Sequence, residues 1–248
     1  MMEKIRVVVN GAKGRMGQET VLAVRGAEDM ELVGECDLGD DLLEAIRGKS
    51  ADAVVDFTVP TSAMDNVLRI LETDCAGIIG TTGFKPEQIE DLRGRASSRK
   101  RGILIAPNFA IGAVLMMHFA EEAARFMHEA EIMELHHAKK ADAPSGTAIK
   151  TAELIAKAWK DAAVSVKSPI GAGETPRGRM VEGICVHSTR LTGLLAHQEV
   201  IFGGEGQTLT IRHDTLSRSS FMPGVLMGIR EMMKSSGFFY GLDTLLFG

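Results

Sequence analysis

Short apolar segments alternate with amphipathic segments of helical spacing through the first hundred residues. Residues 5–9 form a β-branched run, typical of a strand that is buried on both faces of a parallel sheet. Further runs that predict strands lie at 31–36, 53–57, 77–80 and 103–106. Between them the apolar spacing predicts helices around 21–24, over 40–47, from 60 to 71 and over 86–96. Strands that alternate with helices pair in parallel through right-handed crossovers, so we predict a Rossmann-type doubly wound parallel sheet.

The pattern changes after residue 106. Helical spacing predicts a helix over 112–126 and another that carries the apolar residues between 148 and 159, with a strand between them over 131–136. Residues 161–182 are rich in glycine and proline and are expected to form a long mobile loop. Three strands follow with little helix between them, at 183–190, 198–202 and 208–213, and a last helix is expected over about 219–234. We therefore predict a second, α+β domain at 110–216, with 1–109 plus 217–248 forming the first domain.

One nearly uncharged segment, residues 103–120, raises the alternative of a membrane span. A spanning helix needs about 20 continuous apolar residues. Pro107, Asn108 and Gly112 interrupt the segment, and His118 lies in its second half. A buried strand, a loop and a buried helix explain the segment better, so no membrane association is expected.

Composition narrows the class of protein. Of the 248 residues, 45% are hydrophobic and 25% are charged, which is ordinary for a globular protein. A net charge of −5 lacks the basic excess of a nucleic-acid-binding protein. The chain does not open with a secretory-signal pattern, and its three cysteines are far apart. These features predict a reduced, cytoplasmic protein without a cysteine metal site.

A glycine-rich turn joins the first strand to the first helix. Gly11, Gly14 and Gly17 allow a tight turn and the close approach of a pyrophosphate. The helix start beyond them offers unpaired N–H groups and the positive end of a dipole, and Arg15 adds a charge. The G-x-x-G-x-x-G spacing is a weak signal alone, and a glycine turn without a ligand is the alternative. The preceding strand, the following helix and an acidic residue about 20 positions later, Asp37, strengthen the dinucleotide interpretation.

Asp37 bears on the choice of cofactor. A carboxylate at this place accepts hydrogen bonds from the ribose hydroxyls of an adenosine and repels the additional phosphate of NADP. The next residue is Leu38, not an arginine that would offset the repulsion. The sequence therefore favours NADH over NADPH, with a plain solvated turn residue as the alternative role for Asp37.

Other strand ends are expected to line the same crevice, because ligands of doubly wound sheets bind beyond the carboxyl ends of the strands. Small and hydroxyl-bearing residues there leave room for ribose and nicotinamide. They occur at 57–58, 80–83 and 106–109. Each segment alone is an ordinary loop signal, but together they predict a groove.

The densest reactive chemistry lies between residues 134 and 148. A predicted strand leads into two adjacent histidines, His136 and His137; Lys140 follows, and Ser-Gly-Thr at 145–147 opens a helix. An imidazole exchanges protons near neutral pH, a lysine supplies positive charge or a proton, and a helix start favours a carboxylate. This set suits a small dicarboxylate, with purely structural histidines as the alternative. A metal site is disfavoured, because neighbours on a strand point apart and no third ligand is obvious.

The sequence closely resembles the family of 4-hydroxy-tetrahydrodipicolinate reductases (dihydrodipicolinate reductases) over nearly the whole chain. The resemblance rests on residues 11–17, 56–58, 80–83 and 107–109, and above all on Glu134-x-His-His-x-x-Lys-x-Asp-Ala-Pro-Ser-Gly-Thr-Ala148. It implies NAD(P)H-dependent reduction of 4-hydroxy-tetrahydrodipicolinate, through dihydrodipicolinate, to tetrahydrodipicolinate in diaminopimelate and lysine biosynthesis. It also implies a cytoplasmic homotetramer that uses NADH or NADPH. Leu38 departs from several relatives, which carry there an arginine that favours NADPH.

The resemblance further implies roles for individual residues. His136 is expected to donate or accept a proton, Lys140 to be a second proton donor, and His137, Gly146 and Thr147 to contact the substrate. The implied cofactor contacts are Gly11, Ala12, Lys13, Gly14, Arg15, Met16, Asp37, Gly80, Thr81, Thr82, Ala106, Pro107, Asn108 and Phe109. The first domain is then the dinucleotide-binding domain and the second the substrate-binding and oligomerisation domain. Independently of the resemblance, the two separate domains lead us to expect closure over the substrate about hinges near Ala110 and Leu216.

Two other functions stay open on the residues alone. A nicotinamide-dependent dehydrogenase for a different imine or a sugar would share the glycine turn, although the paired histidines and Ser-Gly-Thr argue against a neutral sugar. A non-catalytic cofactor-sensing protein would need the turn but neither His136 nor Lys140. A substrate panel tests the first alternative, and an NADH oxidation assay tests the second.

Overall fold

The computed structural model describes residues 3–163 and 177–248. Contacts divide the chain into two compact units, one comprising Met1–Ile111 with Arg218–Gly248 and the other Gly112–Ser217. The loop that we expected at 161–182 lies largely outside the described residues. Within its described part the prediction was wrong at Arg179–Val181, which is a short strand, β7.

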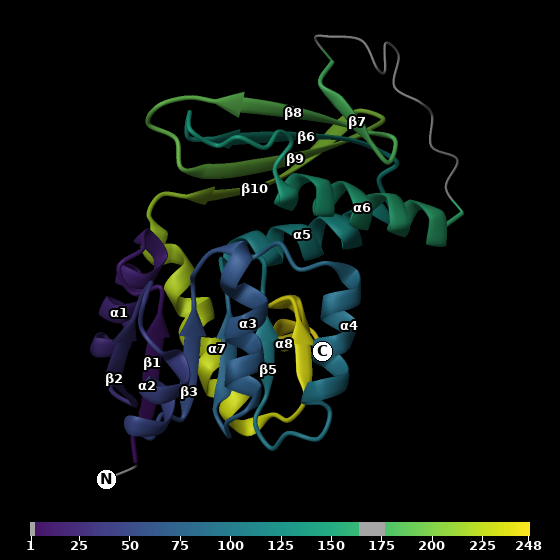
Figure 1. Cartoon of the computed structure of the whole chain (residues 1–248). Coiled ribbons are helices and arrows are strands. Elements are labelled where there is room, and N and C mark those ends of the chain that lie inside the picture. The colour runs from purple at the N-terminus through teal and green to yellow at the C-terminus, as the bar shows by residue number, and fades with distance from the viewer. Residues whose placement is uncertain (1–2, 164–176) are drawn as a thin grey trace. The chain divides into compact units, whose positions relative to one another are not determined.

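The first unit is built on a six-stranded sheet in which every pair of neighbouring strands is parallel (Figure 1). The strand order is β11-β5-β4-β3-β1-β2. The strands are β1 (Ile5–Asn10), β2 (Met30–Cys36), β3 (Ala53–Asp56), β4 (Ala76–Ile79), β5 (Ile103–Ile105) and β11 (Phe238–Tyr240). The prediction of a Rossmann-type doubly wound sheet is confirmed.

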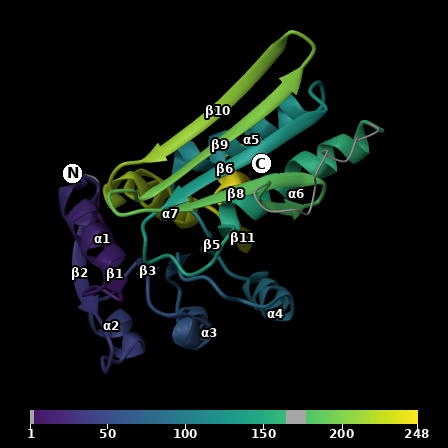
Figure 2. The same ribbon diagram turned by 90° about the horizontal axis from the view of Figure 1, so that it is seen from above.

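Helices cover both faces of this sheet, as Figure 2 shows from above. One face carries α1 (Arg15–Gly26) and α7 (Met222–Lys234), and the other carries α2 (Leu42–Gly48), α3 (Pro60–Leu71) and α4 (Pro86–Ala96). All residues of β3 and β4 are buried, because both sides of the central strands are covered. The apolar core on one side includes Val8, Val54, Val67, Ile79 and Leu92.

The end of the chain differs from the prediction in one place and adds a strand that was not predicted. The last helix does not begin at residue 219: Arg218–Phe221 is a 3-10 turn (η1), and Pro223 lies in the first turn of α7, where proline suits a helix. Beyond it, Phe238–Tyr240 forms β11, which pairs with β5 at the sheet edge and was not predicted. A short last helix, α8, spans Asp243–Leu246.

The second unit is built on a five-stranded mixed sheet of order β10-β9-β6-β8-β7, whose first four strands lie side by side in Figure 2. The strands besides β7 are β6 (Glu129–His136), β8 (Ile184–Arg190), β9 (Ala196–Gly204) and β10 (Gln207–Thr215). Only β6 and β8 pair in parallel. Helices α5 (Ile111–Ala124) and α6 (Gly146–Asp161) share one apolar core with the sheet, centred on Ile132, Ile155, Trp159 and Phe202. The α+β prediction is confirmed.

The segment considered as a membrane span, 103–120, contains β5, a loop and most of α5. Among residues 3–163 and 177–248, no helix has the length and apolar character needed to cross a bilayer.

Candidate active-site residues

The glycine turn between β1 and α1 has a backbone that only glycine permits. Gly11 has φ of +78°, and a Cβ on it would lie 2.6 Å from the carbonyl oxygen of Phe57. A Cβ on Gly17 would lie 2.0 Å from the carbonyl oxygen of Gly11. Gly14 is the N-cap of α1 and provides no side-chain cap, so the helix start presents its backbone N–H groups at the turn. Lys13 and Arg15 are exposed beside it, and the whole arrangement fits a bound pyrophosphate.

Asp37 follows β2 and is tied to this turn. One carboxylate oxygen accepts a hydrogen bond from the backbone N–H of Lys13 and the other from that of Leu38, each at 2.8 Å. The backbone hydrogen bonds of Leu38 and Lys13 hold the pKa of Asp37 below its usual value. The side chain of Leu38 is fully exposed at 100%. An ionised carboxylate is therefore held next to the turn, at the place where an adenosine ribose would bind.

The remaining predicted cofactor segments follow the carboxyl ends of β4 and β5. A Cβ on Gly80 would lie 2.0 Å from the ring of Phe57, so glycine lets that ring pack on the end of β4. The rings of Phe57 and Phe109 meet edge to face with centroids 5.9 Å apart. Thr82 and Pro107 are exposed, Gly80 and Asn108 are half-buried, and Thr81, Ala106 and Phe109 are buried. The structure thus brings the predicted segments to one edge of the sheet, at the carboxyl ends of the parallel strands.

A buried carboxylate that we had not assigned organises this edge. Asp56, the last residue of β3, is 0% exposed and accepts hydrogen bonds from the side chains of Asn10, Thr58, Asn66 and Thr81 at 2.7–2.9 Å. These donors come from β1, α3 and the segments after β3 and β4. Asp56 therefore fixes three of the strand ends that the predicted groove requires.

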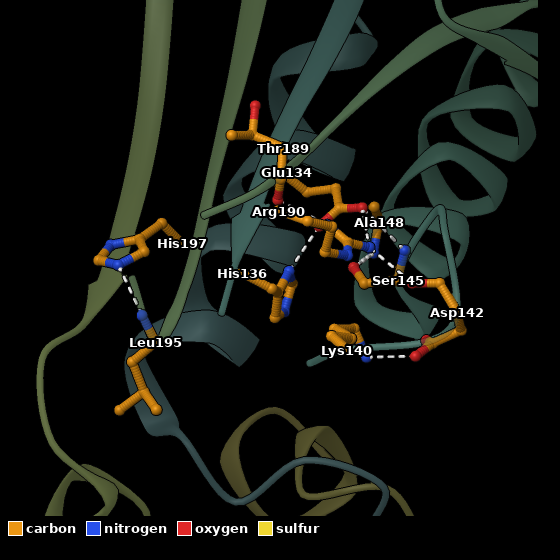
Figure 3. Close-up of polar contacts among 10 residues, drawn as sticks. All are labelled: Glu134, His136, Lys140, Asp142, Ser145, Ala148, Thr189, Arg190, Leu195 and His197. Atoms are coloured by element: carbon orange, nitrogen blue, oxygen red, sulfur yellow. Dashed lines mark hydrogen bonds and ion pairs between the residues drawn. The ribbon is translucent and has the colours of Figure 1, made fainter. Parts of the chain in front are cut away.

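In the second unit a buried carboxylate, Glu134, lies among the residues of the 134–148 segment (Figure 3). Its Oε2 lies 2.5 Å from Nδ1 of His136, and its Oε1 accepts the backbone N–H of Ser145 at 3.2 Å. Burial raises the pKa of Glu134, but hydrogen bonds from His136, Arg190 and Ser188 outweigh burial and lower it to about 2. Glu134 is therefore ionised at neutral pH.

Arg190 binds this carboxylate from the neighbouring strand. Its Nη1 and Nη2 donate to the two oxygens of Glu134 at 2.9 and 2.8 Å, and Nη2 also donates to the carbonyl oxygen of Asp142 at 2.6 Å. Arg190 ends β8 and is the register partner of His136, which ends β6. We had not predicted Arg190, and no local pattern points to a partner on another strand. Glu134 did leave a signal, because residues two apart on a strand share a face and Glu134 therefore lies on the side of His136.

His136 and Lys140 both keep polar groups at the edge of this cluster. Nδ1 of His136 is engaged by Glu134, so Nε2 is the nitrogen available for proton exchange. Nζ of Lys140 lies 2.8 Å from Oδ1 of Asp142 (Figure 3). The hydrogen bond from Lys140 lowers the pKa of Asp142, so this is an ion pair at neutral pH. The side chains of His136 and Lys140 are 14% and 22% exposed.

The start of α6 is a second polar feature of the cluster. Ser145 is its N-cap and accepts the backbone N–H of Ala148 at 3.2 Å, and the first turn contains no acidic side chain. Gly146 is exposed, and a Cβ on it would meet open space. Thr147 is half-buried next to it. This helix start is suited to a carboxylate.

His137 lies one residue beyond the end of β6, so the alternation of strand neighbours does not apply to it. Its ring is half-buried, and its backbone N–H donates to the carbonyl oxygen of Leu195 at 3.4 Å. Within residues 3–163 and 177–248, no three side chains of metal-ligating type are grouped closely enough to hold a metal ion.

Comparisons with known proteins cover both units. The family model described as dihydrodipicolinate reductase, N-terminus, matches residues 5–109, and the one described as dihydrodipicolinate reductase, C-terminus, matches residues 112–246. The chain is 52% identical over 246 residues to 4-hydroxy-tetrahydrodipicolinate reductase of Nocardia farcinica, with 98% of each chain covered. It is 51% identical over 253 residues to the enzyme of the same name from Cutibacterium acnes, again with 98% of each covered.

Comparisons with solved structures agree with these family matches. A dipicolinate-bound dihydrodipicolinate reductase from Paenisporosarcina superposes with a TM-score of 0.87 at 39% identity, covering 98% of this chain and 99% of that one. An amine dehydrogenase from Mycobacterium smegmatis superposes with a TM-score of 0.67 at 13% identity, covering 98% and 96%, and shows a shared fold alone.

These matches bear on cofactor and activity. The matched N-terminal region contains the glycine turn, Asp37 and the strand ends, which together support a nicotinamide cofactor. The relatives at about half identity are reductases matched over nearly their full length, so an oxidoreductase activity is shown. The chain belongs to the dihydrodipicolinate reductase family.

Proposed function

We propose that this chain reduces 4-hydroxy-tetrahydrodipicolinate, through dihydrodipicolinate, to tetrahydrodipicolinate with NADH or NADPH, in diaminopimelate and lysine biosynthesis. The observation that carries the proposal is the grouping of His136, Lys140 and the start of α6 around one buried ion pair, Glu134–Arg190, in a chain of this family. The grouping offers a proton-exchanging ring, a cation and an anion-binding helix start, which a cyclic dicarboxylate requires.

The first unit would hold the cofactor, which supplies a hydride from nicotinamide C4 when bound. Residues Gly11 to Met16 would surround the pyrophosphate, and Asp37 would accept hydrogen bonds from the ribose hydroxyls. Gly80 to Thr82 and Ala106 to Phe109 would contact the nicotinamide end. The uncapped start of α1 and the positions where a Cβ would clash with backbone support this assignment. The exposed Leu38 beside the ionised Asp37 supports a preference for NADH.

The second unit would hold the two carboxylates of the substrate. The helix start at Gly146 and Thr147 supplies N–H groups, and the open space at Gly146 lets an anion approach the backbone. Lys140 supplies a positive charge, which Asp142 holds at 2.8 Å. His137 would complete the contacts.

His136 and Lys140 would donate the proton that the reaction requires. Addition of a hydride to the conjugated imine of dihydrodipicolinate leaves an enamine, which must gain one proton to form the product. Nε2 of His136 would deliver this proton, because Nδ1 is bound to Glu134, and Lys140 would be the second donor.

Two substitutions test this assignment. His136→Ala and Lys140→Ala are each expected to lower kcat/KM for the substrate by about 10²–10⁴-fold, the usual value of a positioned proton donor. The affinity of the first unit for NADH, measured by fluorescence, should not change. If both variants keep the kcat/KM of the wild type, the assignment is wrong.

We also infer a cytoplasmic homotetramer, as the resemblance implies. The three cysteines are buried and free, which suits a reducing compartment. Sedimentation of the purified chain tests the oligomeric state, and a monomer at micromolar concentration would contradict it.

A further inference from the structure

Glu134 contacts several residues of the candidate site, although the proposed function gives it no role of its own. It is completely buried, yet it contacts the ring of His136, the first backbone N–H of the helix cap and both ends of the Arg190 guanidinium. A buried charge is costly unless it is paired and fully hydrogen-bonded, and here the contacts with His136, Ser145 and Arg190 join the carboxylate to the candidate site.

We propose that Glu134, held in place by Arg190, is a positioning residue that keeps a proton on Nδ1 of His136 and so reserves Nε2 for the substrate. This proposal deepens the proposed function and rests on it, because it takes His136 to be the group that exchanges a proton.

The chemistry of the carboxylate fixes the proton. An ionised carboxylate only accepts hydrogen bonds, so the nitrogen of His136 that lies 2.5 Å from Oε2 must carry a hydrogen. In the neutral ring this leaves Nε2 as the basic nitrogen, and in the protonated ring Nε2–H is the donor that faces away from Glu134. The same contact therefore serves both states of the ring.

Arg190 and Ser145 fix the carboxylate itself. Arg190 donates to both oxygens, a bidentate geometry that sets the plane of the carboxylate as well as its position. The backbone N–H of Ser145 occupies Oε1, so Oε2 is the oxygen turned to His136. Through Nη2, Arg190 also reaches the carbonyl oxygen of Asp142, the residue whose side chain pairs with Lys140. One buried ion pair thus orients both of the proposed proton donors (Figure 3).

The same strand provides a matched comparison. Glu131, three residues before Glu134, also pairs with a histidine, His187, at 2.8 Å and with an arginine, Arg177. Its side chain is 38% exposed rather than buried, and an odd spacing along a strand places it on the other face. Glu131→Gln removes the same charge from the same strand without touching His136.

The experiment measures the tautomer of His136 and the kinetics together. In the wild type, ¹⁵N NMR of labelled protein, assigned with His136→Ala, is expected to show the proton on Nδ1 when the ring is neutral. In Glu134→Gln, Arg190 is expected to donate to the amide oxygen of the new side chain. The amide NH₂ group then faces Nδ1 of His136 and donates to it, so the ring proton should move to Nε2. We expect kcat/KM to fall by about 10²-fold or more, chiefly through kcat, because the wrong tautomer cannot exchange the proton.

Glu131→Gln should leave both the tautomer and kcat/KM as in the wild type. A neutral wild-type ring with its proton on Nε2 would overturn the proposal, and this result does not depend on how any variant folds. Wild-type kcat/KM in a Glu134→Gln variant that binds NADH normally would overturn it too. Failure of the proposed function looks different: His136→Ala would then be fully active while the wild-type tautomer still has Nδ1 protonated.

Discussion

Asp37 and Glu134 are both ionised carboxylates, but their surroundings differ. Asp37 accepts hydrogen bonds from two backbone N–H groups near the surface. Glu134 is buried and its oxygens are occupied by His136, Ser145 and Arg190. We therefore expect Asp37 to select a ligand and Glu134 to act on other side chains.

The cofactor preference follows from Asp37 and its neighbour. We expect a higher kcat/KM with NADH than with NADPH in the wild type, because an ionised Asp37 repels the additional phosphate. Leu38→Arg should raise kcat/KM with NADPH by about tenfold, equivalent to one charge-assisted contact of about 1.4 kcal/mol. Leu22→Arg, at an exposed site on α1, is the control and should leave the ratio unchanged. A large NADPH advantage in the wild type would contradict this expectation.

Some of these residues could be predicted from the sequence and others could not. The placement of Asp37 beside the glycine turn follows from a local spacing, and His136 and Lys140 follow from a compact motif. The role of Glu134 did not, because its partner Arg190 is 56 residues away and is brought next to it only by the pairing of β6 with β8. The role of Asp56 was not predicted for the same reason, because the side chains that donate to it come from four separate segments.

Among the secondary-structure elements, the carboxyl ends of the parallel strands are joined by one buried network. Asp56 at the end of β3 holds Asn10 at the end of β1 and Thr81 after β4. The side chains that donate to Asp56 are neutral amides and hydroxyls, so removal of the acceptor leaves several donors without a partner.

Asp56→Asn tests this network. The amide NH₂ would meet donors instead of accepting from them, so we expect the free energy of unfolding to fall by at least about 2 kcal/mol and the affinity for NADH to weaken. Urea denaturation and NADH fluorescence measure the two effects. Asp65→Asn, on the exposed side of α3, is the control and should change neither. Unchanged stability of Asp56→Asn would show that the network contributes little.

Glu134 joins β6, β8 and the start of α6, and its ionisation should make the free energy of unfolding depend on pH in acid. The pKa of Glu134 is about 2 in the folded chain and 4.5 for an ordinary glutamate, so its ionised form stabilises the folded chain at neutral pH. This contribution, on the order of 3 kcal/mol, is lost as the pH falls from about 4.5 to about 2. The difference in unfolding free energy between wild type and Glu134→Gln should therefore shrink over this range. A difference that does not vary with pH in urea titrations would contradict the assignment.

Most helices and strands could be predicted from apolar spacing, because buried β-branched runs and amphipathic stripes are local signals. The two missed strands, β7 and β11, have three residues each, and only pairing with β8 or β5 makes them strands. Such short edge strands depend on a partner from elsewhere in the chain, which no local pattern contains.

For the molecule as a whole, the chain passes between the two units twice, at Ile111–Gly112 and at Ser217–Arg218. The proposed cofactor segments belong to one unit and the proposed substrate residues to the other. Hydride transfer requires donor and acceptor atoms in contact, and closure about hinges near Ala110 and Leu216 stays a prediction. Small-angle scattering should show a smaller radius of gyration with NADH and dipicolinate together than without ligands. No change would count against closure.

The proposed function depends on one step, the transfer of a hydride from a nicotinamide to a cyclic dicarboxylate. The most direct test incubates the purified chain with freshly generated 4-hydroxy-tetrahydrodipicolinate and NADH that carries deuterium at both C4 positions. Mass spectrometry of tetrahydrodipicolinate should then show one deuterium per molecule, and His136→Ala should form this product far more slowly. Unlabelled product, or no product with either NADH or NADPH, would show that the chain does not carry out this reaction.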